Sequence, residues 1–260
     1  MLGAIAGDII GSVYEHHNVK RKDFHLLSPD AFFTDDTVLT VALADALLTK
    51  TPYVDKLKQF YRSYPNAGFG GYFIRWAGSS DTQPYNSFGN GAAMRVSPVA
   101  YAFENLSSVL LEAERSSAVT HNHPEGIKGA QATAVAIFLA RKNTGRQEIK
   151  AYIETNFGYE LDDRLDDIRI TYEYNETCQG SVPQAIIAFL ESDSYEDAIR
   201  NAISIGGDSD TLACITGGIA AAFYGGIPET IARFALGKLD DALSGIVKNF
   251  EQRWVHSRVY

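Results

Sequence analysis

The sequence is poor in the features that nucleic-acid binders and disulfide-stabilised proteins need. Its 23 Lys and Arg are outnumbered by 32 Asp and Glu, which gives a net charge of −9. Affinity for a phosphate backbone depends on clustered basic residues, and the basic run at 20–22 is too short to form such a surface. Two cysteines, Cys178 and Cys214, cannot make a disulfide framework, and we expect a protein of the reducing cytoplasm.

The sequence also lacks a segment typical of membrane or secreted proteins. Its longest apolar run, 212–227, is shorter than the roughly 20 residues that a spanning helix needs. The N-terminal apolar stretch has no basic region before it and is interrupted by Asp8, unlike a signal peptide. We therefore expect no membrane partner. The 260 residues, 45% of them hydrophobic, suffice for one sizeable core, and we predict a single domain over 1–260.

Apolar residues recur at helical spacing along most of the chain. The stretches with this spacing are 38–48, 54–61, 106–119, 127–139, 182–190, 198–205, 212–223 and 236–250, and a short helix is expected at 72–77. A capping-box spacing at 181–184 indicates a helix start there. Only 168–172 alternates in the manner of a strand, and it is too short to form a sheet. We therefore predict an all-α fold, with a Gly- and Pro-rich loop segment at 64–90.

Three glycines near the N-terminus are spaced four residues apart, so that they share one face of the helix expected there. They are Gly3, Gly7 and Gly11. Because glycine has no side chain, this face can pack closely against another helix. Glu15 follows the same helix and, taken alone, would be a solvated helix end.

Two acidic clusters, Thr34-Asp35-Asp36-Thr37 and Asp208-Ser209-Asp210-Thr211, each open an apolar helical stretch. Their oxygen ligands suit Mg²⁺, Mn²⁺ or Ca²⁺ better than zinc, which prefers imidazole or thiolate. Four carboxylates around a single cation would leave uncompensated repulsion, which favours two divalent cations. Either cluster alone could be a helix cap. However, one cap needs one acceptor, and each cluster offers several.

Five segments of the sequence, in this order, resemble the ADP-ribosylglycohydrolases, the family of the dinitrogenase-reductase-activating glycohydrolase and the ADP-ribosyl-acceptor hydrolases. They are GAIAGDIIGSVYE at 3–15, FTDDT at 33–37, GNGAAMR at 89–95, HNHP at 121–124 and GDSDT at 207–211. The resemblance covers most of the chain. It implies a compact single-domain orthogonal helical bundle with a dinuclear metal site in a central cleft.

The resemblance also assigns roles to residues of this sequence. Metal ligands are expected at Thr34, Asp35, Asp36, Asp208, Asp210 and Thr211, and catalytic groups at Asp36, Asp210 and Glu15. Contacts to the bound nucleotide are expected from Gly68, Phe69, Gly70, Phe88, Gly89, Asn90, Gly91 and His121. In this scheme the 89–91 loop offers backbone donors to the diphosphate and an amide to ribose, and Phe88 or Tyr85 stacks on adenine. Met94 and Arg95 receive no role, because they lie further into the following helix.

These expectations combine into a hydrolase, dependent on two Mg²⁺ or Mn²⁺ ions, that removes ADP-ribose from a modified acceptor by cleaving the glycosidic bond at the distal ribose. The substrate would be an ADP-ribosylated protein or a small ADP-ribose conjugate, with arginine linkage favoured. Serine, ester and nucleic-acid acceptors stay open. Two other classes also remain: a dinuclear-metal nucleotide phosphoesterase, and a non-catalytic ADP-ribose-binding relative. The presence of all six metal-ligand positions speaks against the second.

Overall fold

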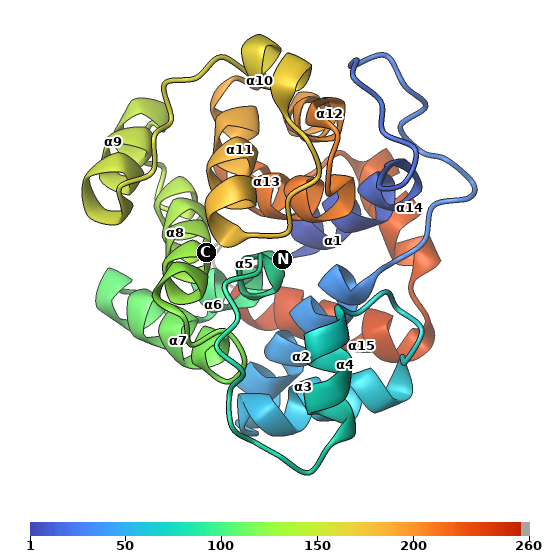
Figure 1. The fold of residues 1–260 in the computed structure, drawn as a ribbon. Coiled ribbons are helices and arrows are strands. Elements are labelled where there is room, and N and C mark those ends of the chain that lie inside the picture. Colours follow the sequence, from blue (N-terminus) through green and yellow to red (C-terminus); the bar gives the residue numbers. More distant parts are fainter. Residues whose placement is uncertain (256–260) are drawn as a thin grey trace.

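Helices make up all the regular secondary structure of residues 1–255, the part of the chain that the computed structural model describes (Figure 1). The one β feature in this range is an isolated bridge between Gly89 and Thr177. The all-α prediction is therefore confirmed. The predicted domain limit at 260 includes residues 256–260, which lie outside the described residues.

The helices follow one another closely along the chain. They are α1 (Leu2–Gly11), the 3-10 helix η1 (Ser12–Tyr14), α2 (Asp35–Thr49), α3 (Tyr53–Ser63), α4 (Gly71–Gly78), α5 (Gly91–Met94), α6 (Ser97–Ala102), α7 (Leu106–Ala118), α8 (Pro124–Arg141), α9 (Arg146–Phe157), α10 (Leu165–Thr171), α11 (Cys178–Leu190), α12 (Tyr195–Ile205), α13 (Ser209–Phe223), α14 (Glu229–Lys238) and α15 (Asp241–Trp254). No helix within residues 1–255 combines the length and the apolar character that crossing a bilayer requires.

The packing of α1 against α13 forms the centre of the fold (Figure 1). A Cβ added to Gly7 would lie 2.0 Å from the carbonyl oxygen of Ala213, and one added to Gly11 would lie 2.6 Å from Cα of Asp210. Only glycine permits backbones to approach this closely. The predicted close packing of the N-terminal glycine face is confirmed, and it brings the end of α1 to the start of α13.

The other helices surround this pair. In Figure 1, α2, α3, α4 and α15 lie below it, α7 and α8 lie to the left, and α10, α11 and α12 lie above. α13 is buried on all sides along most of its length. A helix that is apolar all round and rich in small residues suits this central position. The N-terminal end of α13 is thereby held in a fixed place within the core.

The segment 168–172, which alternates in the manner of a strand, forms none, in line with the all-α prediction. Residues 168–171 belong to α10, in which Leu165 and Ile168 are buried one turn apart while Ile170 is 82% exposed. A spacing of three residues places two side chains on the same helical face. Arg169 and Asp166 form a further pair of this spacing, with 2.6 Å between Nη1 and Oδ1. A short apolar run fits both the two-residue period of a strand and the 3.6-residue period of a helix. Here tertiary packing selects the helix.

Two predicted helix boundaries are also wrong. The stretch 236–250 is split between α14 and α15, because the side chain of Asp240 accepts from the backbone N–H of Leu243 at 2.9 Å and starts a new helix. The start expected at 181–184 lies earlier, where the Thr177 hydroxyl accepts from the N–H of Gly180. Ser181 instead donates to the carbonyl of Asn175 at 2.7 Å.

Candidate metal centre and ligand cleft

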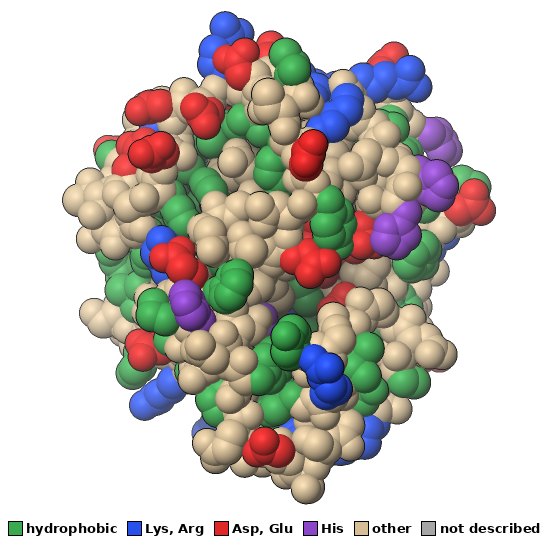
Figure 2. Space-filling view, in the orientation of Figure 1, with side chains coloured by type: hydrophobic (Ala, Val, Ile, Leu, Met, Phe, Trp, Pro, Cys, Tyr) green, Lys and Arg blue, Asp and Glu red, His purple; other side chains and the backbone are tan. Residues whose placement is uncertain are grey.

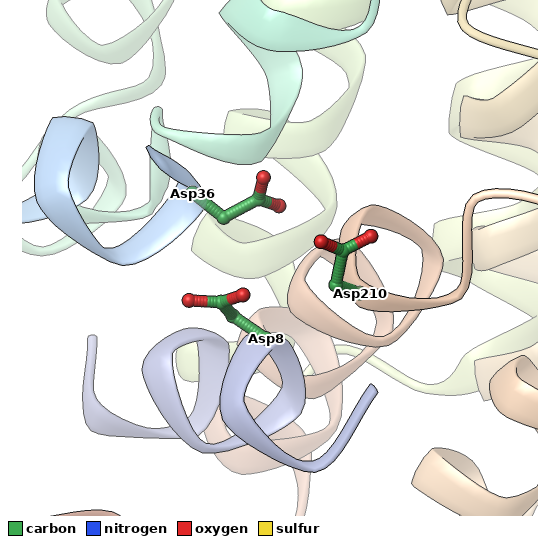
Figure 3. A group of neighbouring side chains, drawn as sticks. All are labelled: Asp8, Asp36 and Asp210. Atoms are coloured by element: carbon green, nitrogen blue, oxygen red, sulfur yellow. The ribbon is translucent and has the colours of Figure 1, made fainter. Parts of the chain in front are cut away.

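Carboxylates from the ends of α1, α2 and α13 converge at the centre of the molecule. Asp8, Asp36 and Asp210 each offer an oxygen within 4.8 Å of the other two (Figure 3). Glu15, Asp208 and Asp210 form a second group with the same property. Asp210 belongs to both groups. The geometry therefore provides two adjacent places where a cation could be held by three carboxylates.

The local structure explains why these side chains meet. The Thr34 side chain caps α2, which puts Asp36 in the first helical turn. Asp208 is the N-cap residue of α13, after Gly206 and Gly207 with φ of 76° and 71°. A bare helix N-terminus repels cations through its dipole. Carboxylates in the first turns of α2 and α13 reverse the sign of the local field.

Asp8 is a functional candidate that the sequence analysis missed. Its carboxylate is fully buried and accepts from the backbone N–H of Thr34 and of Thr37, both at 3.1 Å. It also accepts from both threonine hydroxyls, at 2.6 Å for Thr34. Asp8 thus fixes the start of α2 against α1. An aspartate inside an otherwise apolar, glycine-rich helix is the sequence signal that could have found it.

The carboxylates carry an unfavourable concentration of negative charge. Burial raises the pKa of Asp8 to about 7, with repulsion from Asp210 as the next cause. Burial and Asp210, in the same order, raise the pKa of Asp35, Asp36 and Asp208 well above the usual range and raise that of Glu15 as well. Such shifts are expected where like charges share a site of low dielectric.

The donor set fits hard divalent cations. Oδ2 of Asp36 is buried and has no hydrogen-bond partner among the described residues. An unpaired buried carboxylate oxygen is costly, whereas a bound cation would satisfy it. The groups contain oxygen ligands alone, as Mg²⁺ and Mn²⁺ prefer. The residues present therefore match the chemistry of a divalent metal centre.

Neighbouring polar side chains orient two of the candidate ligands. Nδ2 of Asn90 donates to Oδ2 of Asp208 at 2.7 Å and to Oγ of Ser181 at 3.1 Å. The hydroxyl of Thr211 donates to Oδ1 of Asp36 at 3.3 Å. The Asn90 amide, expected to contact ribose, is thus engaged by Asp208. Such outer partners typically hold metal ligands in place.

A cleft of about 370 Å³ opens above the carboxylates. Figure 2 shows acidic side chains, in red, beside the hollow at the centre of this face. The residues predicted for the site that line the cleft are Glu15, Thr34, Asp35, Asp36, Gly68, Gly70, Gly89, Asn90, Gly91, His121, Asp208, Asp210 and Thr211. A larger cavity of about 1010 Å³ lies among α1, α13, α14 and α15, away from these carboxylates. The chemistry points to the smaller cleft.

Two of the predicted nucleotide contacts do not line the cleft. Phe69 is buried, with its ring centroid 5.2 Å from that of Phe73 and 5.3 Å from that of Tyr61, and it serves core packing. Phe88 is 44% exposed and packs beside His123, with 5.2 Å between ring centroids. Stacking on adenine from Phe88 stays a prediction.

The expected backbone donors of the 89–91 loop are partly committed to the protein. The N–H of Gly89 donates to Oγ of Ser87 at 3.1 Å, and that of Asn90 donates to the carbonyl of Glu176 at 2.7 Å. Neither donor is therefore free for a diphosphate in this conformation. The bonds instead hold the loop against the segment before α11, which shapes one wall of the cleft.

Further residues line the cleft without having been predicted to, and four of them bear on its chemistry. α5 ends at Met94, so Met94 and Arg95 lie at the end of a short helix and border the cleft. With only four residues, α5 is shorter than the helix expected there, which is why these two residues reach the cleft. Tyr174 and Glu176 also line it, and the Tyr174 hydroxyl donates to Oε1 of Glu15 at 3.3 Å. No sequence pattern pointed to this pair.

The fold and the site together define a class: an all-α domain whose helix ends carry a candidate divalent-metal centre under a ligand-sized cleft. Comparison with known proteins gives the family. The model of the family described as ADP-ribosylglycohydrolase matches residues 1–257, and the chain belongs to this family. The resemblance seen in the sequence is thereby confirmed.

Individual similar proteins also bear names of this family. The chain is 27% identical over 314 residues to ADP-ribosylhydrolase ARH3 of Mus musculus, covering 88% of this chain and 84% of the relative. It is 27% identical over 266 residues to ADP-ribosylarginine hydrolase Tri1 of Pseudomonas putida, covering 86% of this chain and 69% of the relative. A solved structure titled ADP-ribosylglycohydrolase-related protein complex shares the fold, with a TM-score of 0.72, 24% identity and 96% of each chain covered.

Proposed function

We propose that this protein is a Mg²⁺- or Mn²⁺-dependent hydrolase that releases ADP-ribose from a modified acceptor by cleaving the glycosidic bond at the distal ribose. One observation carries the proposal: two groups of three carboxylates share Asp210, and every member except the fully buried Asp8 lines the cleft. Two divalent cations would balance this charge better than one. A phosphoesterase could use the same ligands, but membership of the ADP-ribosylglycohydrolase family favours the glycosidic bond.

The chain's own residues have distinct tasks in this reaction. Bound cations would supply Lewis acidity toward the ribose hydroxyls and toward the attacking water. Asp36 and Asp210 are the candidate bases, since either carboxylate can accept the proton of that water as the bond from the anomeric carbon to the acceptor breaks. Their negative charge also faces the positive charge that develops at this carbon. Asn90 and Thr211 keep the carboxylates in position through the bonds described above.

The acceptor we propose is an arginine side chain of an ADP-ribosylated protein. Glu15, Tyr174 and Glu176 line the cleft, and these acidic and aromatic groups suit a planar guanidinium. Glu15 could hold the leaving group close to the metal ligands, because one of its oxygens lies within 4.8 Å of Asp208 and Asp210. The name of the Pseudomonas relative, an ADP-ribosylarginine hydrolase, points to the same acceptor.

The test is release of ADP-ribose from three substrates: ADP-ribosylated arginine, ADP-ribosylated serine and an ADP-ribosylated nucleic acid, each with Mg²⁺, with Mn²⁺ and with EDTA. We expect metal-dependent release that is fastest from the arginine linkage. Faster release from serine or from nucleic acid would overturn the proposed acceptor. Binding of ADP-ribose without any release would indicate a non-catalytic relative, and phosphate release from a nucleotide would indicate a phosphoesterase.

A further inference from the structure

A hydrogen-bonded chain of buried side chains leads from the core to His121. Nη2 of Arg95 donates to Oγ1 of Thr120 at 2.7 Å and to the carbonyl of Ser116 at 3.2 Å. The same Thr120 oxygen lies 2.7 Å from Nδ1 of His121. Arg95 and Thr120 are 0% exposed and His121 is 5% exposed, so water does not compete for these bonds.

Arg95 fixes the direction of the first hydrogen bond in this chain. A guanidinium has donors alone, so Oγ1 of Thr120 must accept from Arg95. The Thr120 hydroxyl therefore has its single proton available for Nδ1 of His121. Tyr85 lies beside the same hydroxyl, and burial raises the pKa of its phenol to about 12. The phenol thus keeps its proton at neutral pH and carries no charge beside the chain.

A ring that accepts at Nδ1 and is neutral carries its proton on Nε2. Burial and the charge of Arg95 both lower the pKa of His121 well below its usual value, so the imidazole is neutral. Nε2 faces the glycine loop: a Cβ added to Gly91 would lie 3.3 Å from it, and one added to Gly89 would lie 3.6 Å from it. His121 lines the cleft at this point.

Arg95 adds a positive charge behind the ring. None of the ion pairs within residues 1–255 includes Arg95, and its Nε and Nη1 atoms are buried there without hydrogen-bond partners. Burial lowers the pKa of Arg95 to about 10, with Asp35 acting in the opposite direction, so the group remains charged at neutral pH. A buried cation without a paired anion is costly. An anionic ligand in the adjacent cleft would offset that cost.

We propose that Arg95 and Thr120 are positioning residues that hold neutral His121 as the Nε2–H tautomer, so that its ring donates a hydrogen bond to an anionic group of the ligand. For an ADP-ribose ligand this group is the diphosphate, and that identification rests on the proposed function. The tautomer itself does not depend on the proposed function. The relay would also explain the glycine at 91, since a Cβ there would lie 3.3 Å from Nε2 and press on the donating edge of the ring.

The decisive variants change only the Thr120 hydroxyl. Thr120→Val keeps the shape of the side chain but removes the hydroxyl, so that Nδ1 loses its donor and the tautomer preference is lost. Thr120→Ser keeps the hydroxyl and should behave as wild type. Thr133→Val is the matched control, because Thr133 in α8 is as buried as Thr120 but its hydroxyl has no partner among the described residues.

Two readouts apply to the full-length protein. Nitrogen-15 NMR of the histidine rings, with the His121 signals assigned from His121→Ala, should show a proton on Nε2 in wild type, Thr120→Ser and Thr133→Val. Calorimetric titration with ADP-ribose in the presence of Mg²⁺ should show binding weakened roughly ten- to a hundredfold in Thr120→Val. His121→Ala should weaken it at least as much, while Thr120→Ser and Thr133→Val should stay within about threefold of wild type.

A proton on Nδ1 of His121 in the wild-type protein would overturn the relay, and this measurement needs no variant. So would a Thr120→Val protein that folds, shows an altered tautomer and still binds ADP-ribose as wild type does. If the wild-type ring has its proton on Nε2 and the tautomer changes in Thr120→Val, but wild type does not bind ADP-ribose, the relay stands and the proposed function fails.

Discussion

The floor and the wall of the cleft are built differently. The floor consists of carboxylates at the ends of α1, α2 and α13, where glycine-mediated contact between α1 and α13 fixes the backbone. The wall at 64–90 is irregular except for α4, and it carries exposed aromatic side chains such as Tyr72, which is 69% exposed. At Gly70 and Gly71 an added Cβ would meet nothing within 4 Å.

Metal binding in the floor and substrate recognition in the wall place different requirements on the structure. Cation ligands must be held within fractions of an ångström, which favours rigid helices with tightly packed ends. Recognition of a substrate tolerates sequence change and is often carried by loops on such a scaffold. We therefore expect substitutions in the floor to affect chemistry and folding, and substitutions in the wall to affect affinity alone.

The largest effect is expected from Asp36→Asn and Asp210→Asn. Each change keeps the volume and one oxygen but removes a charge and a basic site, so release of ADP-ribose should fall at least about 10²-fold. The metal-free variants should melt no lower than wild type, because one of several repelling carboxylates has gone. Substrate turnover with metal and thermal melting without it check both statements.

The control for this pair is Asp163→Asn, an exposed aspartate in the segment before α10, which should leave turnover unchanged. Near-wild-type turnover in both site variants would remove Asp36 and Asp210 from the mechanism. Loss of turnover accompanied by a lower metal-free melting temperature would instead indicate that the substitutions act through misfolding.

A second pair of substitutions compares the packing of floor and wall directly. Gly7→Ala would place a Cβ 2.0 Å from the carbonyl oxygen of Ala213, so α1 must move away from α13. Overpacking of this kind costs about 1–3 kcal/mol, or more where backbone must shift. Gly71→Ala enters open space and should change stability by less than about 1 kcal/mol. Urea unfolding of both variants tests this, and equal losses of stability would contradict the distinction.

The sequence alone located most of the floor, because Asp, Gly and Thr at helix starts follow local rules. It did not locate Asp8, whose partners Thr34 and Thr37 lie on another helix and are brought close only by the packing of α1. It likewise gave no role to Arg95, since the length of α5 is set by tertiary contacts. The alternation around Ile170 was ambiguous for a related reason: a short apolar run fits the two-residue period of a strand and the 3.6-residue period of a helix until its neighbours are known.

A smaller effect is expected from pH in the metal-free protein. The pKa of Asp8 is about 7 when folded and 3.8 for the unperturbed group, so between these values the folded state holds a proton that the unfolded chain has released. Stability should therefore fall as pH rises from about 4 to about 7. The raised pKa values of Asp35, Asp36 and Asp208 act in the same direction.

Thermal melting in EDTA at several pH values measures this dependence. A loss of about 1 kcal/mol would lower the melting temperature by roughly 2–4 °C. With saturating Mg²⁺ the dependence should weaken or reverse, because bound cations favour the ionised carboxylates. A metal-free protein that became more stable over this range would contradict the assignment of the floor as a cluster of mutually repelling acids.

The number of bound cations tests the central claim most directly. Calorimetric titration of the metal-free protein with Mn²⁺ should give two ions per chain, since the carboxylates form two groups that share Asp210. Asp208→Ala removes a ligand from one group and should abolish at least one tight site, whereas Asp210→Ala should impair both. A single ion in the wild-type protein, or unchanged binding in Asp208→Ala, would contradict the dinuclear centre.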